Sequence, residues 1–221
     1  MVVKENLENI KKNIPENVTL ICVSKTKPVE LIKEAYDLGE RNFGENKVQE
    51  LVEKYEELPK NIKWHLIGNL QKNKVKYIVD KIHLLHSLDN VELLQELEKR
   101  CAQKQCLVNA LIQVNIGREE SKHGVLEEDL EELLDYCKEA KYVHIKGLMF
   151  IIPKGDEENC RHYFKKSKQL FLKLKDKNIN NVSMEILSMG MTNDYMWAIE
   201  EGSTMVRIGQ GIFGKRIYKN L

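Results

Sequence analysis

The stretch T-L-I-C-V-S-K-T-K-P, residues 19–28, places an apolar run directly before a polar junction that ends in proline. The apolar run predicts a buried strand over residues 18–24, and the sequence after it has the spacing of a helix. Strand alternation puts Ile21, Val23 and Lys25 on one side, so the lysine leaves the strand among core side chains. Because lysine amines form imines with carbonyl compounds, Lys25 is a candidate reactive group.

The same alternation of strand and helix recurs along the rest of the chain. The predicted strands lie near residues 18–24, 41–45, 63–68, 82–88, 107–116, 143–151, 183–189 and 204–209. Segments with helical spacing lie between them, and an extra helix over residues 7–12 precedes the first strand. The pattern predicts an α/β fold, a single (β/α)8 TIM barrel domain over residues 1–221. An open doubly wound sheet is the alternative, but no G-x-G-x-x-G turn follows the first strand.

Composition favours a small-molecule partner in the cytoplasm. The chain carries 35 basic and 34 acidic residues, a formal net charge of +1, which supplies no global field for nucleic acid or an anionic membrane. The N-terminus lacks the apolar region of a signal peptide, and no apolar run has the length of a membrane span. The five cysteines include no Cys-x-x-Cys pair and the six histidines show no ligand spacing, so we expect no metal.

Polar residues and glycines follow the seventh and eighth predicted strands. Ser188 and Gly190 lie at the end of the seventh strand, while Arg207 and Gly209 lie at the end of the eighth. In a (β/α)8 barrel the carboxyl ends of the strands meet at one mouth, and the loops after strands seven and eight commonly bind phosphate. A hydroxyl, two glycine backbones and a guanidinium therefore predict an anion site opposite Lys25.

An imine-forming lysine facing a phosphate site describes a pocket for a phosphorylated aldehyde. Pyridoxal 5′-phosphate (PLP) fits both halves, with Arg207 facing the pyridine nitrogen. A guanidinium cannot accept the ring proton, so the ring would be a weak electron sink and carbanion chemistry would be damped. A class I aldolase-type barrel that acts on sugar phosphates shares the lysine and the phosphate site, but its imine lysine commonly lies on a later strand.

Polar side chains also follow other predicted strands. Glu45 and Asn46 come after the second strand and are offered to the mouth, although Asn46 can equally be the N-cap of the next helix. His65, on the third strand, is interpreted as a core or mouth-lining histidine rather than a general base. The loop over residues 121–124 is assigned a structural role first and a ligand role second.

Six blocks of this sequence resemble the signature blocks of the pyridoxal phosphate homeostasis proteins. The blocks are V-S-K-T-K-P (23–28), F-G-E-N (43–46), W-H-x-I-G (64–68), S-K-x-G (121–124), S-M-G-M (188–191) and V-R-I-G (206–209). The resemblance implies a barrel similar to the N-terminal domain of alanine racemase, with PLP held as an internal aldimine. The implied contacts are Lys25 as the aldimine lysine, Arg207 at the pyridine nitrogen, Asn46 near the ring, and Ser188, Gly209 and the backbone of Gln210 at the phosphate.

The resemblance implies a non-catalytic carrier that buffers PLP and releases it to enzymes that need it. The alternative is an amino-acid racemase of weak activity. Racemases of the resembled fold use a lysine and a tyrosine on opposite faces of the cofactor, and the tyrosine comes from a C-terminal domain after the barrel. This chain stops at Leu221, just after the eighth predicted strand, which favours the carrier. We expect a monomer whose partners are PLP and PLP-dependent apo-enzymes.

Overall fold

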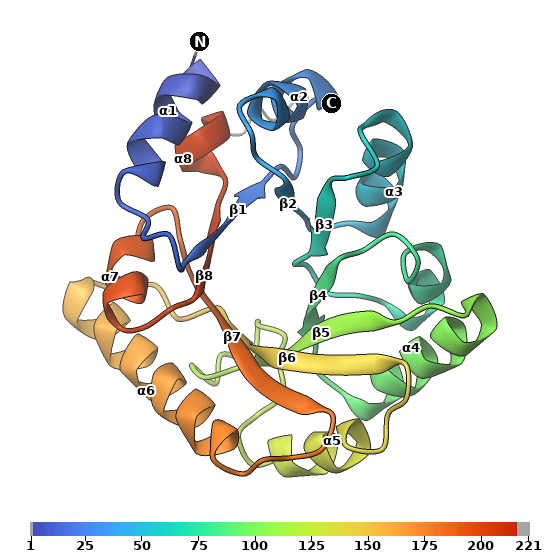
Figure 1. Ribbon diagram of the computed structural model, residues 1–221. Coiled ribbons are helices and arrows are strands. Elements are labelled where there is room, and N and C mark those ends of the chain that lie inside the picture. The colour runs from blue at the N-terminus through green and yellow to red at the C-terminus, as the bar shows by residue number, and fades with distance from the viewer. Residues whose placement is uncertain (1, 216–221) are drawn as a thin grey trace.

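The computed structural model describes residues 2–215 and contains a closed barrel of eight parallel strands (Figure 1). Neighbouring strands pair in chain order from β1 to β8, and β1 closes the ring by pairing with β8. The strands are β1 Thr19–Val23, β2 Asn42–Glu45, β3 Lys63–Leu66, β4 Leu84–Leu88, β5 Val108–Val114, β6 Val143–Phe150, β7 Val182–Met191 and β8 Met205–Ile208. The predicted (β/α)8 barrel is confirmed.

Helices cover the outside of this barrel and form a ring around it in Figure 1. They are α1 Val2–Lys11, α2 Val29–Asp37, α3 Val48–Glu57, α4 Val91–Lys104, α5 Leu130–Cys137, α6 Glu157–Lys175, α7 Tyr195–Glu200 and α8 Gln210–Phe213. The crossover between β3 and β4 is a 3-10 helix, η1 Lys72–Tyr77, where helical spacing predicted an α-helix. In η1 only Val75 is buried. The segment therefore lacks the apolar contacts that would stabilise a longer α-helix.

Strand alternation separates two apolar layers. Ile21 and Val23 of β1 belong to a small cluster inside the barrel that also contains Leu111, Met149 and Met205. The intervening residues of each strand join the larger core between barrel and helices. The side of β1 assigned to Lys25 is therefore the inside of the barrel, as predicted.

The first and last described elements pack against each other. Helix α1, which was predicted to begin at residue 7, begins at Val2, and the Nδ2 of Asn6 donates to the carbonyl oxygen of Ile212 in α8 at 3.0 Å. Figure 1 shows α1 and α8 side by side above β1 and β8. Within residues 2–215, none of the helices combines the length and the apolar character that crossing a membrane requires.

Candidate functional site

A cavity of about 620 Å³ opens at the C-terminal mouth of the barrel. The predicted site residues that line it are Lys25, Asn46, Arg207, Gly209 and Gln210. They come from the ends of β1, β2 and β8, which are distant in sequence and converge only because the barrel closes. This volume lies within the range of pockets that hold small-molecule ligands.

The other two predicted site residues lie beside the cavity rather than on its lining. Ser188 is completely buried, and its hydroxyl accepts a hydrogen bond from Nη1 of Arg207 at 2.6 Å. Gly190 has a φ of +94°, and a Cβ there would come within 2.6 Å of the Cβ of Ala198 in α7. Gly190 therefore allows the close packing of β7 against α7. Ser188 does not line the cavity itself but is hydrogen-bonded to Arg207, which does.

The turn that carries Lys25 is fixed by a buried ionic cluster, which we call the Lys54 network. The Nζ of Lys54 donates to Oε1 of Glu45 at 2.8 Å, to the Ser24 carbonyl oxygen at 2.8 Å and to Oε1 of Glu50 at 2.7 Å. The Ser24 hydroxyl donates to Oε1 of Glu45 at 2.6 Å, and the backbone N–H of Thr26 donates to Glu50 at 2.6 Å. Both neighbours of Lys25 in the chain are thus held in place.

Glu45 does not reach the mouth, contrary to the sequence-based expectation. Its side chain is completely buried, because Lys54 on α3 and the Ser24 hydroxyl draw it toward the helix layer. Burial raises the pKa of Glu45 to about 7, although Lys54 and Ser24 both act to lower it. Its second carboxylate oxygen, Oε2, is buried and has no hydrogen-bond partner among residues 2–215, which also favours the protonated form.

The strand does not continue through Lys27. Thr26 adopts a φ of +61°, so the chain turns and Lys27 does not stay on the side of Lys25. The Nζ of Lys27 donates instead to the carbonyl oxygens of Phe213 and Gly214, at 2.9 and 3.0 Å. Lys27 therefore ties the turn after β1 to the end of α8.

Arg207 is a buried cation with uncharged hydrogen-bond acceptors. Besides Ser188, it contacts the Phe150 carbonyl oxygen, which accepts from Nη2 at 2.8 Å. Burial lowers the pKa of Arg207 to about 10, and the negative charge of Asp194 opposes this shift. The side chain remains charged at neutral pH, and the same cavity presents Asp194 and Lys25.

Behind Arg207, hydrogen bonds continue through the barrel from mouth to mouth. Ser188 Oγ lies 3.3 Å from Nδ1 of His86, Nε2 of His86 lies 3.0 Å from Nδ1 of His65, and Nε2 of His65 lies 3.2 Å from Oδ1 of Asn42. We call this series, Arg207–Ser188–His86–His65–Asn42, the histidine chain. His65 is thus a buried core histidine, one of the two roles predicted for it.

The acceptor at Asn42 sets the proton positions in the histidine chain. The amide oxygen of Asn42 only accepts, so the neutral His65 ring donates to it from Nε2 and accepts at Nδ1. The Ser188 hydroxyl accepts from Arg207, and its hydrogen can be donated to Nδ1 of His86. His86 then carries its proton on Nε2 and donates to His65, which in turn donates to Asn42. Burial lowers the pKa of His65 to about 3 and that of His86 well below its ordinary value. Both imidazoles are neutral at physiological pH.

Thr192 and Lys154 are among the cavity residues that were not identified from the sequence. Thr192 lines it after β7, and its Oγ1 accepts from the backbone N–H of Gly211 at 3.4 Å. Lys154, after β6, adds a further cation to the lining. The signal for Thr192 was present, since its hydroxyl lies two residues beyond Gly190 in the predicted phosphate-binding loop.

The structure also decides the role of Asn46 at its helix. The N-cap of α3 is Lys47, whose side chain makes no capping hydrogen bond. The N-cap interpretation of Asn46 is therefore wrong, and its place is on the cavity lining. Gly209, which follows β8, allows a close approach to β1: a Cβ there would lie 3.1 Å from the Val23 carbonyl oxygen.

Fold and site together define a (β/α)8 barrel of the alanine racemase class, with an amine and a guanidinium at one mouth. The family described as "Alanine racemase, N-terminal domain" matches residues 2–216. The pyridoxal phosphate homeostasis protein of Aquifex aeolicus is 46% identical over 201 residues, covering 90% of this chain and 87% of that protein. The Escherichia coli K12 protein of the same name is 39% identical over 208 residues, covering 92% and 88%.

The chain belongs to the pyridoxal phosphate homeostasis protein family, which confirms the resemblance. Among solved structures, PipY of Synechococcus elongatus PCC7942 with PLP bound is similar, with a TM-score of 0.88 and 33% identity. This similarity covers 96% of the present chain and all of the PipY chain.

Proposed function

We propose that this protein binds PLP in the cavity at the C-terminal mouth and acts as a carrier that buffers the cofactor. The observation that carries the proposal is the meeting of Lys25 and Arg207 in one cavity with the loops after β7 and β8. Relatives named for PLP homeostasis and the PLP-bound PipY structure support the choice of ligand. Release to PLP-dependent apo-enzymes is the corresponding role in the cell.

The residues present fit this cofactor. The amine of Lys25 would condense with the aldehyde with loss of water, forming a reversible covalent bond. Gly209 and Gln210, at the start of the short helix α8, offer backbone N–H groups to the phosphate, as loops after strand eight do in barrels of this kind. Thr192 adds a hydroxyl beside Gly211 of α8, and Ser188 acts by holding Arg207.

The expected effect of Arg207 on the pyridine ring of PLP favours a carrier rather than a catalyst. PLP supplies an electron sink when its pyridine nitrogen is protonated. Arg207 only donates hydrogen bonds, so it would hold that nitrogen unprotonated and weaken the sink. Its charge persists because its lowered pKa, about 10, still lies well above neutral pH. The protein would therefore retain the cofactor without removing α-protons from amino acids at a useful rate.

Lys25→Ala tests the covalent attachment. The wild-type protein should be yellow after incubation with PLP, and borohydride reduction followed by peptide mass spectrometry should find the pyridoxyl group on Lys25. Lys25→Ala should lose both signals. Lys154→Met is the matched control, because it removes a cation from the same cavity and should keep them. Labelling of another lysine in the wild type would refute the site.

Proton exchange tests the carrier role against the racemase alternative. The PLP-loaded protein is incubated with L-alanine in deuterated water, and exchange of the α-proton is followed by NMR. A carrier exchanges the proton no faster than free PLP does at the same concentration. Rapid exchange that depends on Lys25 would establish the racemase instead. A monomeric state and a cytoplasmic location stay predictions from the sequence.

A further inference from the structure

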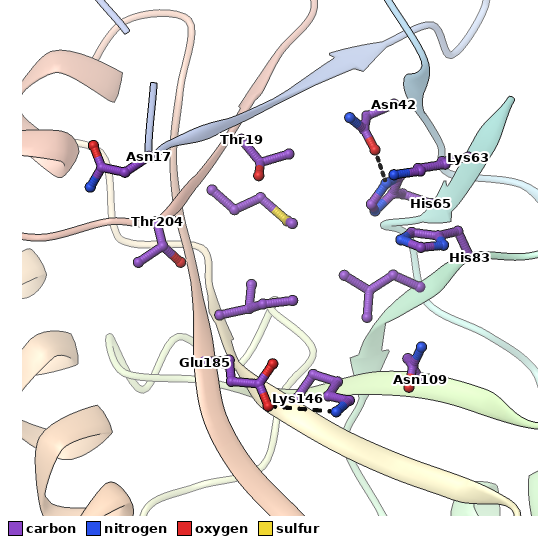
Figure 2. Close-up of a pocket in the computed structure, with 13 residues that line it drawn as sticks. Asn17, Thr19, Asn42, Lys63, His65, His83, Asn109, Lys146, Glu185 and Thr204 are labelled. Carbon is purple, nitrogen blue, oxygen red and sulfur yellow. Dashed lines mark hydrogen bonds and ion pairs between the residues drawn. The ribbon is translucent and has the colours of Figure 1, made fainter. Parts of the chain in front are cut away.

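A second pocket lies at the opposite, N-terminal mouth of the barrel, with a volume of about 410 Å³. Figure 2 shows its lining side chains arranged around an open centre. They stand at or near the starts of strands, among them Thr19 of β1, Asn42 of β2 and Lys63 of β3. This mouth is far from Lys25 and takes no part in the proposed cofactor site, so its chemistry needs a separate account.

The charged groups at this pocket are predominantly cationic. Lys63 and Lys146 carry positive charge, and the carboxylate of Glu185 lies 3.5 Å from Nζ of Lys146. Among the described residues, no carboxylate lies within ion-pair distance of Lys63 in this structure. His83 lies on the same lining, and burial together with Lys63 lowers its pKa. An anion would relieve the uncompensated charge.

The histidine chain ends in this pocket at Asn42. The Nε2–H of His65 donates to Oδ1 of Asn42, and both residues line the pocket. Figure 2 shows this contact beside Lys63 and His83. A directed chain of donors strengthens the hydrogen bonds to whatever accepts at its end. Because His65 occupies the Asn42 oxygen, the Asn42 amide still has its Nδ2–H donors for a ligand that accepts, and the cations of the pocket favour a negatively charged one.

We propose that the N-terminal mouth is a binding site for a small oxyanion of the phosphate class. Lys63 and Lys146 would supply charge, and Asn42 and Asn109 would supply amide donors around it. The opposed ends of the barrel would thus bind different ligands, a phosphorylated aldehyde at one and an oxyanion at the other. This proposal does not depend on PLP binding.

The test uses inorganic phosphate and the protein without PLP, so that its outcome is independent of the cofactor site. The ring signals of His83 are followed by NMR across pH with phosphate and with chloride at equal ionic strength, and His83→Gln assigns them. Bound phosphate stabilises the protonated ring, so the pKa of His83 should rise in phosphate and not in chloride. Equal pKa values in the two salts would overturn the proposal.

Two variants locate the site. Lys63→Ala should weaken phosphate binding by about threefold to fivefold, the upper range for one exposed ion pair. Lys60→Ala, three residues earlier and paired with Glu56 outside the pocket, should leave phosphate affinity unchanged. Equal affinity in Lys63→Ala and wild type would overturn the proposal. Lys146→Met should also weaken phosphate binding, because Lys146 reaches the pocket from β6 rather than β3.

Discussion

Lys25 and Arg207 face the same cavity but are supported in opposite ways. The Lys54 network lies on the helix side of β1 and β2 and holds the Lys25 turn through charged groups. The histidine chain lies inside the barrel and holds Arg207 through neutral groups. The difference shows that two buried supports of one site can respond differently to pH, because only the first contains a carboxylate whose pKa lies near neutrality.

The strongest test of this comparison removes the cation of the Lys54 network. Lys54→Met leaves Glu45 and Glu50 without their shared donor, and breaking a buried ion pair in this way typically costs about 3–5 kcal/mol of unfolding free energy. Urea denaturation measures the loss. Lys60→Met, on an exposed pair with Glu56, should change stability by less than about 1 kcal/mol. Comparable losses in the two variants would contradict a supporting role for the network.

A pH series separates the two supports. Because the folded-state pKa of Glu45, about 7, lies above its ordinary value of 4.5, the folded protein binds this proton more tightly than the unfolded chain. Its contribution to stability is complete below pH 4.5 and is lost as pH rises through 7. The difference in unfolding free energy between wild type and Glu45→Gln should therefore fall over this window, by at most about 1.4 kcal/mol per pH unit. A flat difference would show that folding does not raise the pKa of Glu45.

The neutral support is tested by Ser188→Ala. The substitution leaves an N–H of Arg207 and Nδ1 of His86 without their partner, at a cost of about 1–3 kcal/mol. It should also speed PLP dissociation, with no change across pH 5–8, because both histidines stay neutral there. Ser183→Ala is the matched control, because it removes a hydroxyl on the same strand that donates to the Ile145 carbonyl oxygen. Unaltered PLP dissociation in Ser188→Ala would remove the positioning role.

The smallest effect is expected at Thr26. Its φ of +61° costs a residue with a Cβ about 1–2 kcal/mol, whereas glycine adopts this conformation freely but loses more entropy on folding. Thr26→Gly should therefore raise the unfolding free energy by up to about 1 kcal/mol, measured by thermal denaturation. A clear loss of stability would show that the Thr26 side chain itself supports the Lys25 turn.

The barrel and the side of β1 that Lys25 occupies could be predicted from the sequence, because both depend on short-range periodicity. The Lys54 network and the histidine chain could not be predicted in this way. His65 and His86 lie on neighbouring strands, but Ser188 comes from β7, and their meeting depends on the stagger of strands around the barrel. Whether Asn46 caps helix α3 or lines the cavity depended on the backbone conformation at Lys47, which residue type alone does not determine.

The pairing of β1 with β8 has a consequence for biosynthesis. Ile21 lies opposite Arg207 in that pairing, although the ribosome makes the two strands at opposite ends of translation. Roughly 180 residues separate Lys25 from Arg207, which at typical synthesis rates of about 5–20 residues per second is roughly 9–36 seconds of elongation. During that interval the nascent chain has the amine but no enclosing pocket. Loading with cofactor is therefore expected only after the last strand has emerged.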